Sequence, residues 1–272
     1  MSITAVGVRL DLVGPRPVAP PHSLVNTPGV VISEDAGRWL NGVNLIGYPD
    51  DTPSLWEPCS EGTFRVKGEG TGRPEATFDP FVCYIPATCS TWGWNDLQEQ
   101  VEAALEATYS MGVEQGLSQG IAGSNNPYFG DGSLVILGGG AVAPPVGLAY
   151  LEDALSQTGR GGIIHATPAV VARLQSVRLA GPAALVTGNG TPLVSGDGYV
   201  GTDPDGAGGP GAHEDYIFVT GPVEVRLGPL VMTELAESLD RSDNTVTFRA
   251  ERYVLATWDT ALQAGVLVDW TL

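Results

Sequence analysis

Few residues of this sequence have both a reactive side chain and the spacing that a catalytic or ligand-binding motif requires. Gly138, Gly139 and Gly140 follow an apolar run and precede Pro144, as a phosphate-binding loop between a strand and a helix would. The triplet lacks the G-x-G-x-x-G spacing and a following Lys-Ser or Lys-Thr. Pro144 and Pro145 also have no amide to offer a phosphate. A plain turn is therefore favoured over nucleotide binding here.

The histidines give no stronger signal for catalysis. His22, His165 and His213 lie far apart along the chain, and a triad of His165 with Ser156 and Asp153 is conceivable. The G-x-S-x-G elbow that presents such a serine in α/β hydrolases is missing. We therefore expect His165 to be a packed residue at the end of a strand.

Metal and cofactor chemistry is equally weakly supported. Cys59, Cys83 and Cys89 form an odd set without C-x-x-C spacing, which argues against a zinc site and a full disulfide framework. The Gly-rich run that starts at Asp203 lacks the later bidentate Glu of a calcium loop. We expect no metal and no cofactor.

Composition narrows the class of protein further. The 272 residues carry a formal net charge of −18 and are 43% apolar, so the chain can build a core and repels nucleic-acid phosphates. No apolar run approaches the roughly 20 residues that span a bilayer, and the first residues lack a secretory pattern. We expect no membrane association and a reducing, aqueous compartment.

The first half of the chain contains segments that cannot bury themselves. Residues 1–60 are rich in proline and predict an extended arm. Residues 62–86 predict a long polar hairpin, with strands at 63–67 and 76–85. Periodic apolar residues at 95–119 predict a helix with one apolar stripe, capped by Asn95 and ended by Gly120.

The second half alternates strand and helix patterns and then returns to strands. The expected helices are 144–155 and 168–174, which open at prolines. The expected strands are 133–137 (buried), 162–166, 183–186 and 192–195 around a Gly188-Asn189-Gly190 turn, 216–220, 223–227, 245–258 and 264–270.

The order of these segments is similar to that of one known family. Three places carry the likeness: Asp79-Pro-Phe-Val-Cys-Tyr-Ile with Cys89-Ser-Thr-Trp-Gly, Gly162-Ile-Ile-His-Ala-Thr-Pro with Leu185-Val-Thr-Gly-Asn-Gly-Thr-Pro-Leu-Val, and Asn244-Thr-Val-Thr-Phe-Arg-Ala-Glu-Arg-Tyr-Val-Leu-Ala. From about residue 55 onward the chain resembles the major capsid proteins of tailed bacteriophages, above all actinobacteriophages. These have the Hong Kong phage capsid fold, which encapsulins share.

The resemblance implies an α+β fold with defined regions. These are an N-terminal arm (1–60), an extended-loop hairpin (61–88), the spine helix with part of the peripheral domain (89–132), an axial domain (133–230) and returning peripheral strands (231–272).

The resemblance also implies a structural protein. Hexamers and pentamers would close into an icosahedral shell around double-stranded DNA that is not bound specifically. The shell would be assembled in the host bacterial cytoplasm and kept in the virion, with scaffolding, portal and decoration proteins as further partners. Three alternatives stay open: an encapsulin-like compartment, a soluble α/β enzyme that uses Gly138–Gly140, and a tail or neck ring protein of the same virus.

Enzymatic activity is not expected, apart from one self-modification that the resemblance suggests. Lys67 lies in the extended-loop hairpin, and Asn244 and Glu251 match the strand that supplies its partners, so Lys67 could form an isopeptide bond with Asn244 while Glu251 accepts the proton. The competing interpretation makes Asn244 a turn residue, pairs Glu251 with Arg249 or Arg252 and leaves Lys67 in solvent.

Overall fold

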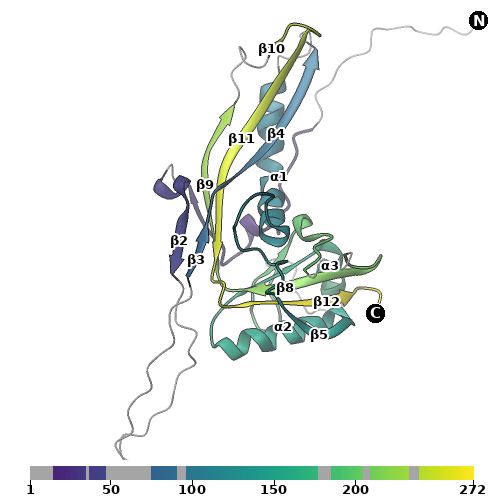
Figure 1. Ribbon diagram of the computed structural model, residues 1–272. Coiled ribbons are helices and arrows are strands. Elements are labelled where there is room, and N and C mark those ends of the chain that lie inside the picture. The colour runs from purple at the N-terminus through teal and green to yellow at the C-terminus, as the bar shows by residue number, and fades with distance from the viewer. Residues whose placement is uncertain are drawn as a thin grey trace, which may run out of the picture.

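The computed structural model describes residues 15–34, 37–46, 75–90, 96–176, 185–204, 209–232 and 239–272. Within them the chain forms an upright sheet with a long helix beside it, a second sheet that crosses its lower end, and a small two-stranded ribbon at the flank (Figure 1). No helix in these ranges is long and apolar enough to cross a membrane.

The upright sheet, called the peripheral sheet below, is organised around one long strand. Its strands among the described residues are β1 (Val31–Glu34), β4 (Phe81–Ser90), β9 (Val223–Met232), β10 (Leu239–Asp240) and β11 (Thr245–Trp258). Strand β11 pairs antiparallel with β4 on one side and with β9 and β10 on the other, and β1 adds to β9 in parallel. The prediction of a long strand at 245–258 is confirmed.

Helix α1 (Leu97–Gln119) packs against β4 and β11. Its N-cap is Asp96, which makes no side-chain capping bond; the expected cap, Asn95, lies outside the described residues. The predicted end at Gly120 is confirmed, since Gly120 has φ 75°.

The prediction of a single apolar stripe on α1 was wrong. Thr108 and Met111 are exposed, whereas Ala107, Glu114 and Ser118 are buried. The reason is that the helix is covered on more than one side. The turns η1 (Leu24–Asn26) and η3 (Asp197–Tyr199) press on it in addition to the sheet.

The second sheet, called the axial sheet below, carries the α/β section. Among the described residues its order is β5 (Val135–Val142), β12 (Gln263–Asp269), β8 (Glu214–Thr220), β6 (Ile163–Ala166) and β7 (Leu193–Ser195). Helices α2 (Pro144–Thr158) and α3 (Pro168–Ser176) open at the expected prolines, and their apolar sides join the core of this sheet. Strand β5 was expected to be buried, but it lies at the edge and exposes Val135 and Ile136.

The chain crosses between the sheets earlier than expected. Strand β8 ends at Thr220 in the axial sheet, and β9 begins at Val223 in the peripheral sheet, so the expected boundary at residue 230 does not follow the sheets. After Trp258 the chain returns, and β12 belongs to the axial sheet rather than to the peripheral strands. Local pattern could not reveal these crossings, because both partner strands are similarly apolar.

The hairpin predicted at 62–86 lies only partly within the described residues. Strand β3 (Glu75–Phe78) pairs antiparallel with β2 (Val43–Ile46), while the residues that follow from Phe81 enter the peripheral sheet as β4. The expected strand at 63–67 lies outside the described residues. The ribbon therefore starts within the region that was expected to be arm.

Part of the expected arm packs on its own subunit. Leu24 is fully buried, Trp39 of the η2 turn (Arg38–Asn41) lies in the core, and β1 is a strand of the peripheral sheet. The prediction that residues 1–60 cannot find a core within the chain is thus wrong for these residues. Hydrophobic anchors at wide spacing, such as Leu24 and Trp39, are enough to seat an otherwise irregular segment.

Candidate functional site

The ribbon is fixed to the body at its root. Phe78, the last residue of β3, lies edge to face on Trp258 with ring centroids 5.0 Å apart, and both side chains are buried. At the other strand, Gly42 has φ 84°, and a Cβ there would lie 2.6 Å from Asp79 Oδ1. The root is therefore well packed, and the ribbon leaves the body at its flank (Figure 1).

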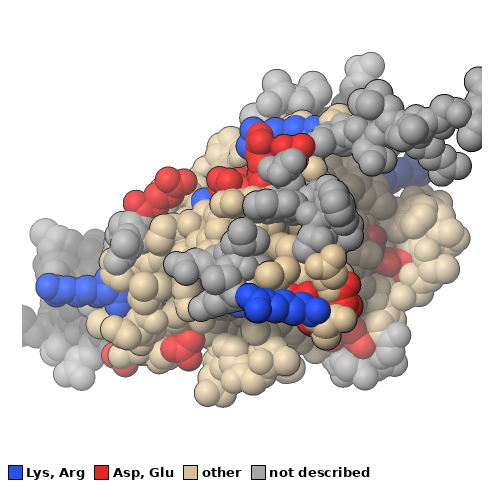
Figure 2. All heavy atoms as spheres, turned by 90° about the horizontal axis from the view of Figure 1, so that it is seen from above, with Lys and Arg blue, Asp and Glu red and all other residues tan. Residues whose placement is uncertain are grey.

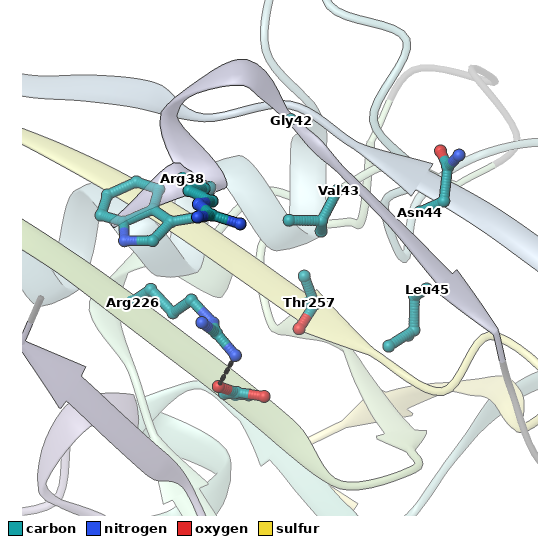
Figure 3. Close-up of a pocket in the computed structure, with 9 residues that line it drawn as sticks. Arg38, Gly42, Val43, Asn44, Leu45, Arg226 and Thr257 are labelled. Carbon is teal, nitrogen blue, oxygen red and sulfur yellow. Dashed lines mark ion pairs between the residues drawn. The ribbon is translucent and has the colours of Figure 1, made fainter. Parts of the chain in front are cut away.

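A hollow of about 420 Å³, lined by both polar and apolar residues, lies beside this root (Figure 3). It is lined by Arg38, Trp39, Gly42, Val43, Asn44, Leu45, Glu224, Arg226 and Thr257. Arg226 forms an ion pair of 2.8 Å with Glu224, and Arg38 contributes a second guanidinium from the η2 turn. Two cations and one carboxylate favour an acidic group as occupant over a metal ion.

The outer face of the peripheral sheet exposes apolar side chains. We define this outer face by Val82 and Tyr84 of β4, Tyr253 of β11 and Val231 of β9, all of which are exposed. Val82 is opposite Tyr253, whereas Tyr84 and Val231 are each opposite Glu251, which lies between them. Exposed apolar and aromatic groups of this kind, here with the charged Glu251 among them, are typical of protein interaction sites.

The opposite face of the same strands is closed by α1. Arg252 forms an ion pair of 2.7 Å with Glu106 and lies over the ring of Tyr109, 5.2 Å from its centroid. Burial raises the pKa of the nearby Cys83 thiol to about 11, so this cysteine is not a reactive thiolate at neutral pH.

Asn244 and Glu251, two residues of the suggested cross-link, are not brought together within the subunit. Asn244 has φ 60° in the turn before β11, and Glu251 forms an ion pair with Arg249 on the same strand. Seven strand residues at about 3.3 Å each separate Asn244 from Glu251 by roughly 23 Å. Lys67 lies outside the described residues.

His165 is a packed residue, as expected. It is fully buried in β6 and its ring nitrogens lie 2.9 Å from Tyr199 Oη and 2.9 Å from Thr220 Oγ1. Burial lowers the pKa of His165 to about 3, so its ring is neutral at pH 7. The suggested triad is not assembled, because Ser156 instead donates to the backbone carbonyl of Asp153 on α2.

The glycine triplet does not form a phosphate loop, and it does not form the expected plain turn either. Gly138 and Gly139 lie inside β5 with φ 86° and 68°, where the pairing with β12 shifts register. Such a bulge bends an edge strand. Among the described residues, no group of three or more His, Cys, Asp or Glu is placed to hold a metal ion.

One buried charge was missed by sequence reasoning. Glu114 on α1 is 1% exposed and accepts hydrogen bonds from the amides of Leu24 (2.9 Å) and Gly198 (3.1 Å) and from the Ser110 hydroxyl (3.2 Å). The Gly196-Asp197-Gly198 turn was the available signal, because a Cβ at Gly196 would lie 2.6 Å from the Glu114 carboxyl carbon. Only glycine lets that turn approach the helix.

Charges are dispersed on the face that Figure 2 shows. Seen from above, acidic and basic side chains of the described residues form small separate groups on a mostly uncharged face (Figure 2). This arrangement differs from the continuous basic stripe that grips a nucleic-acid backbone.

No protein-family model and no curated protein matches the sequence. Solved structures do match. A chain from Mycobacterium phage Adephagia superposes with a TM-score of 0.57 at 10% identity, over 97% of this chain and 95% of that one. A chain from Mycobacterium phage Ogopogo superposes with a TM-score of 0.56 at 13% identity, over 96% of this chain and 97% of that one. A chain from the capsid of an empty GTA particle superposes with a TM-score of 0.54 at 13% identity, over 99% of this chain and 94% of that one.

These matches span almost the whole of both chains, so they concern the complete arrangement of ribbon, spine helix and two sheets. The molecule therefore has an α+β fold of the Hong Kong phage capsid type, as the resemblance implied. At this level of identity the likeness is one of fold.

Proposed function

We propose that this chain is the major capsid protein of a tailed bacteriophage. Copies would form hexamers and pentamers that close into an icosahedral shell around double-stranded DNA. The observation that carries the proposal is the near full-length fold match to a chain of a GTA capsid and to chains of two mycobacteriophages, at TM-scores of 0.54 to 0.57. The role is structural; His165 is buried and Gly138 lies in a strand bulge, which argues against the enzyme alternative.

The ribbon and the outer face supply complementary parts of a subunit contact. The ribbon is packed on the body at Phe78 and leaves it at the flank, while Tyr84 and Tyr253 expose aromatic rings on the peripheral sheet. A ribbon is marginal alone and gains stability by packing. We infer that the extended loop of one subunit lies over the outer face of its neighbour, where both bury apolar area.

The charge of the chain suits a container for DNA. With a net charge of −18, an acidic shell repels phosphates at a distance and lets packaged DNA move without specific binding. We propose that assembly takes place in the host cytoplasm and that scaffolding, portal and decoration proteins are further partners in the virion.

Negative-stain microscopy of the overexpressed full-length chain tests the proposal. Closed particles, formed alone or with a scaffolding protein supplied, are the expected result. A monomer or dimer that never assembles and melts at a higher temperature with a small ligand would contradict it. Particles filled with a cargo protein rather than DNA in the native source would favour the encapsulin-like alternative.

A further inference from the structure

The buried carboxyl of Glu114 joins three parts of the chain that are distant in sequence. It sits on α1, and its two oxygens accept the amides of Leu24, 90 residues before it, and Gly198, 84 residues after it. Leu24 belongs to the turn of the N-terminal arm, and Gly198 to the η3 turn that follows β7 of the axial sheet. One side chain therefore connects the η1 turn of the N-terminal arm, helix α1 and the η3 turn beside the axial sheet.

Neighbouring contacts fix both turns in the same place. Ser118 on α1 donates to the carbonyl of Gly198 at 3.0 Å, so this glycine is held through its amide and its carbonyl. The amide of Ser195 donates to the carbonyl of His22 at 2.9 Å, which ties the arm directly to the axial lobe. The Glu114 carboxyl lies at the centre of this arrangement.

No cation neutralises the carboxyl among the described residues that contact it. Its hydrogen-bond donors are two amides and the Ser110 hydroxyl. The charged or titratable groups that face it from η3 are Asp197, which is acidic, and the fully buried phenol of Tyr199. From the arm, the nearest titratable residue is His22, two positions before Leu24. A charge on Glu114 is thus held in a poorly solvated site beside another acid.

We propose that Glu114 is a proton-controlled latch: uptake of a proton holds the arm turn and the η3 turn against α1, and ionisation loosens them. Burial above all, with a smaller contribution from Asp197, raises the pKa of Glu114 to about 7 against the lowering effect of its hydrogen bonds. If the arm turn lifts, water reaches the carboxyl and its pKa falls toward the ordinary value of about 4.5.

The sign of the effect follows from these two values. The closed state binds the proton more tightly than the open state, so protons favour closure and the closed state loses stability as pH rises from about 4.5 to about 7. Inside this interval each pH unit changes the ratio of closed to open molecules by up to about tenfold. Above it the ratio no longer depends on this group.

Hydrogen exchange followed by mass spectrometry on the full-length chain tests the latch. Peptides that cover residues 22–27 and 196–202 report on the two turns. After correction for the intrinsic exchange rate, we expect their protection to fall by about tenfold or more between pH 5.5 and 7.5. Glu114→Gln cannot change its charge and should abolish this dependence, whereas Glu102→Gln, an exposed residue of the same helix, should keep it.

A second variant keeps the test decisive if Glu114→Gln does not fold. Asp197 is exposed, and Asp197→Asn removes a like charge, so protection of the two turns should fall at a lower pH than in the wild type. Protection that is independent of pH in the wild type, that rises with pH, or that keeps its pH dependence in Glu114→Gln would overturn the proposal.

Discussion

The ring of Phe78 contacts the ring of Trp258 edge to face, at a centroid separation of 5.0 Å and an interplanar angle of 68°. Phe78 ends the ribbon strand β3, and Trp258 ends the long strand β11 just before the chain returns to the axial sheet. Trp258 also contacts Phe129 at 5.2 Å. One aromatic cluster thus joins the ribbon root to the place where the two sheets meet.

Phe78→Ala should therefore lower the free energy of unfolding by about 3–5 kcal/mol, because it leaves a cavity in this cluster. Denaturant unfolding of the unassembled chain measures the loss. Tyr84→Ala, which truncates an aromatic side chain that is 60% exposed, is the matched control. A stability loss of the same size in both variants would contradict the proposed packing of the root.

The outer face should matter for assembly rather than for folding. Replacing Tyr84 and Tyr253 together by serine removes exposed aromatic area, so we expect unfolding to shift by no more than about 0.5 kcal/mol per site. Particle yield, counted by negative-stain microscopy, should fall strongly. Val200→Ser, at an exposed apolar residue directly after the η3 turn, serves as the control. Normal particle yield from the double variant would exclude the outer face as a subunit contact.

Several elements were predictable because their signals are local. The strand at 245–258 shows a long β-rich pattern, and α2 opens at a proline pair and closes at Gly159. The local sequence pattern could not predict which strands pair when they are far apart in the chain. Gly221-Pro222 looks like a hairpin turn, yet β8 and β9 join different sheets. The burial of Glu114 depends on turns 84 and 90 residues away. The pattern of residues along α1 therefore does not indicate that this glutamate is buried.

The close approach of η3 to α1 predicts a contrast between two glycines. A Cβ at Gly198 would lie 2.6 Å from the carbonyl oxygen of Met111, so Gly198→Ala should cost about 1–3 kcal/mol through overpacking. A Cβ at Gly188 meets nothing within 4 Å, and Gly188→Ala should be neutral or stabilise by about 0.4–1 kcal/mol. Thermal unfolding compares them. Equal effects at both positions would argue against the tight contact.

His165 predicts a loss of stability in acid. Its pKa is lowered by burial to about 3 in the folded chain and is near 6.5 when unfolded, so the unfolded state alone takes up the proton between these values. The contribution is present above pH 6.5 and is lost as pH falls toward 3. His165→Gln should be less stable by about 1–3 kcal/mol at pH 7.5. It should also lose less stability than the wild type between pH 6.5 and 5.

Urea unfolding at several pH values measures this difference, with His213→Gln, at an exposed histidine, as the control. Glu114 contributes in the opposite direction between about pH 4.5 and 7, because its raised pKa makes the folded state bind the proton. In the wild type the two contributions therefore offset each other between about pH 6.5 and 5, and Glu114→Gln alone should show the steepest loss of stability toward acid. An unchanged acid dependence in His165→Gln would contradict the assignment to this residue.

The shell should be held together without a covalent bond between Lys67 and Asn244. That reaction needs a carboxylate that can take the lysine proton beside the attacked carboxamide. In the subunit Glu251 is paired with Arg249, and it lies roughly 23 Å along the strand from Asn244. Glu251 could serve Asn244 only from another subunit and only when freed from its arginine. Denaturing electrophoresis of purified particles should therefore give one band at 28.3 kDa. A ladder of multiples that disappears in Lys67→Arg would show instead that neighbouring subunits complete the site.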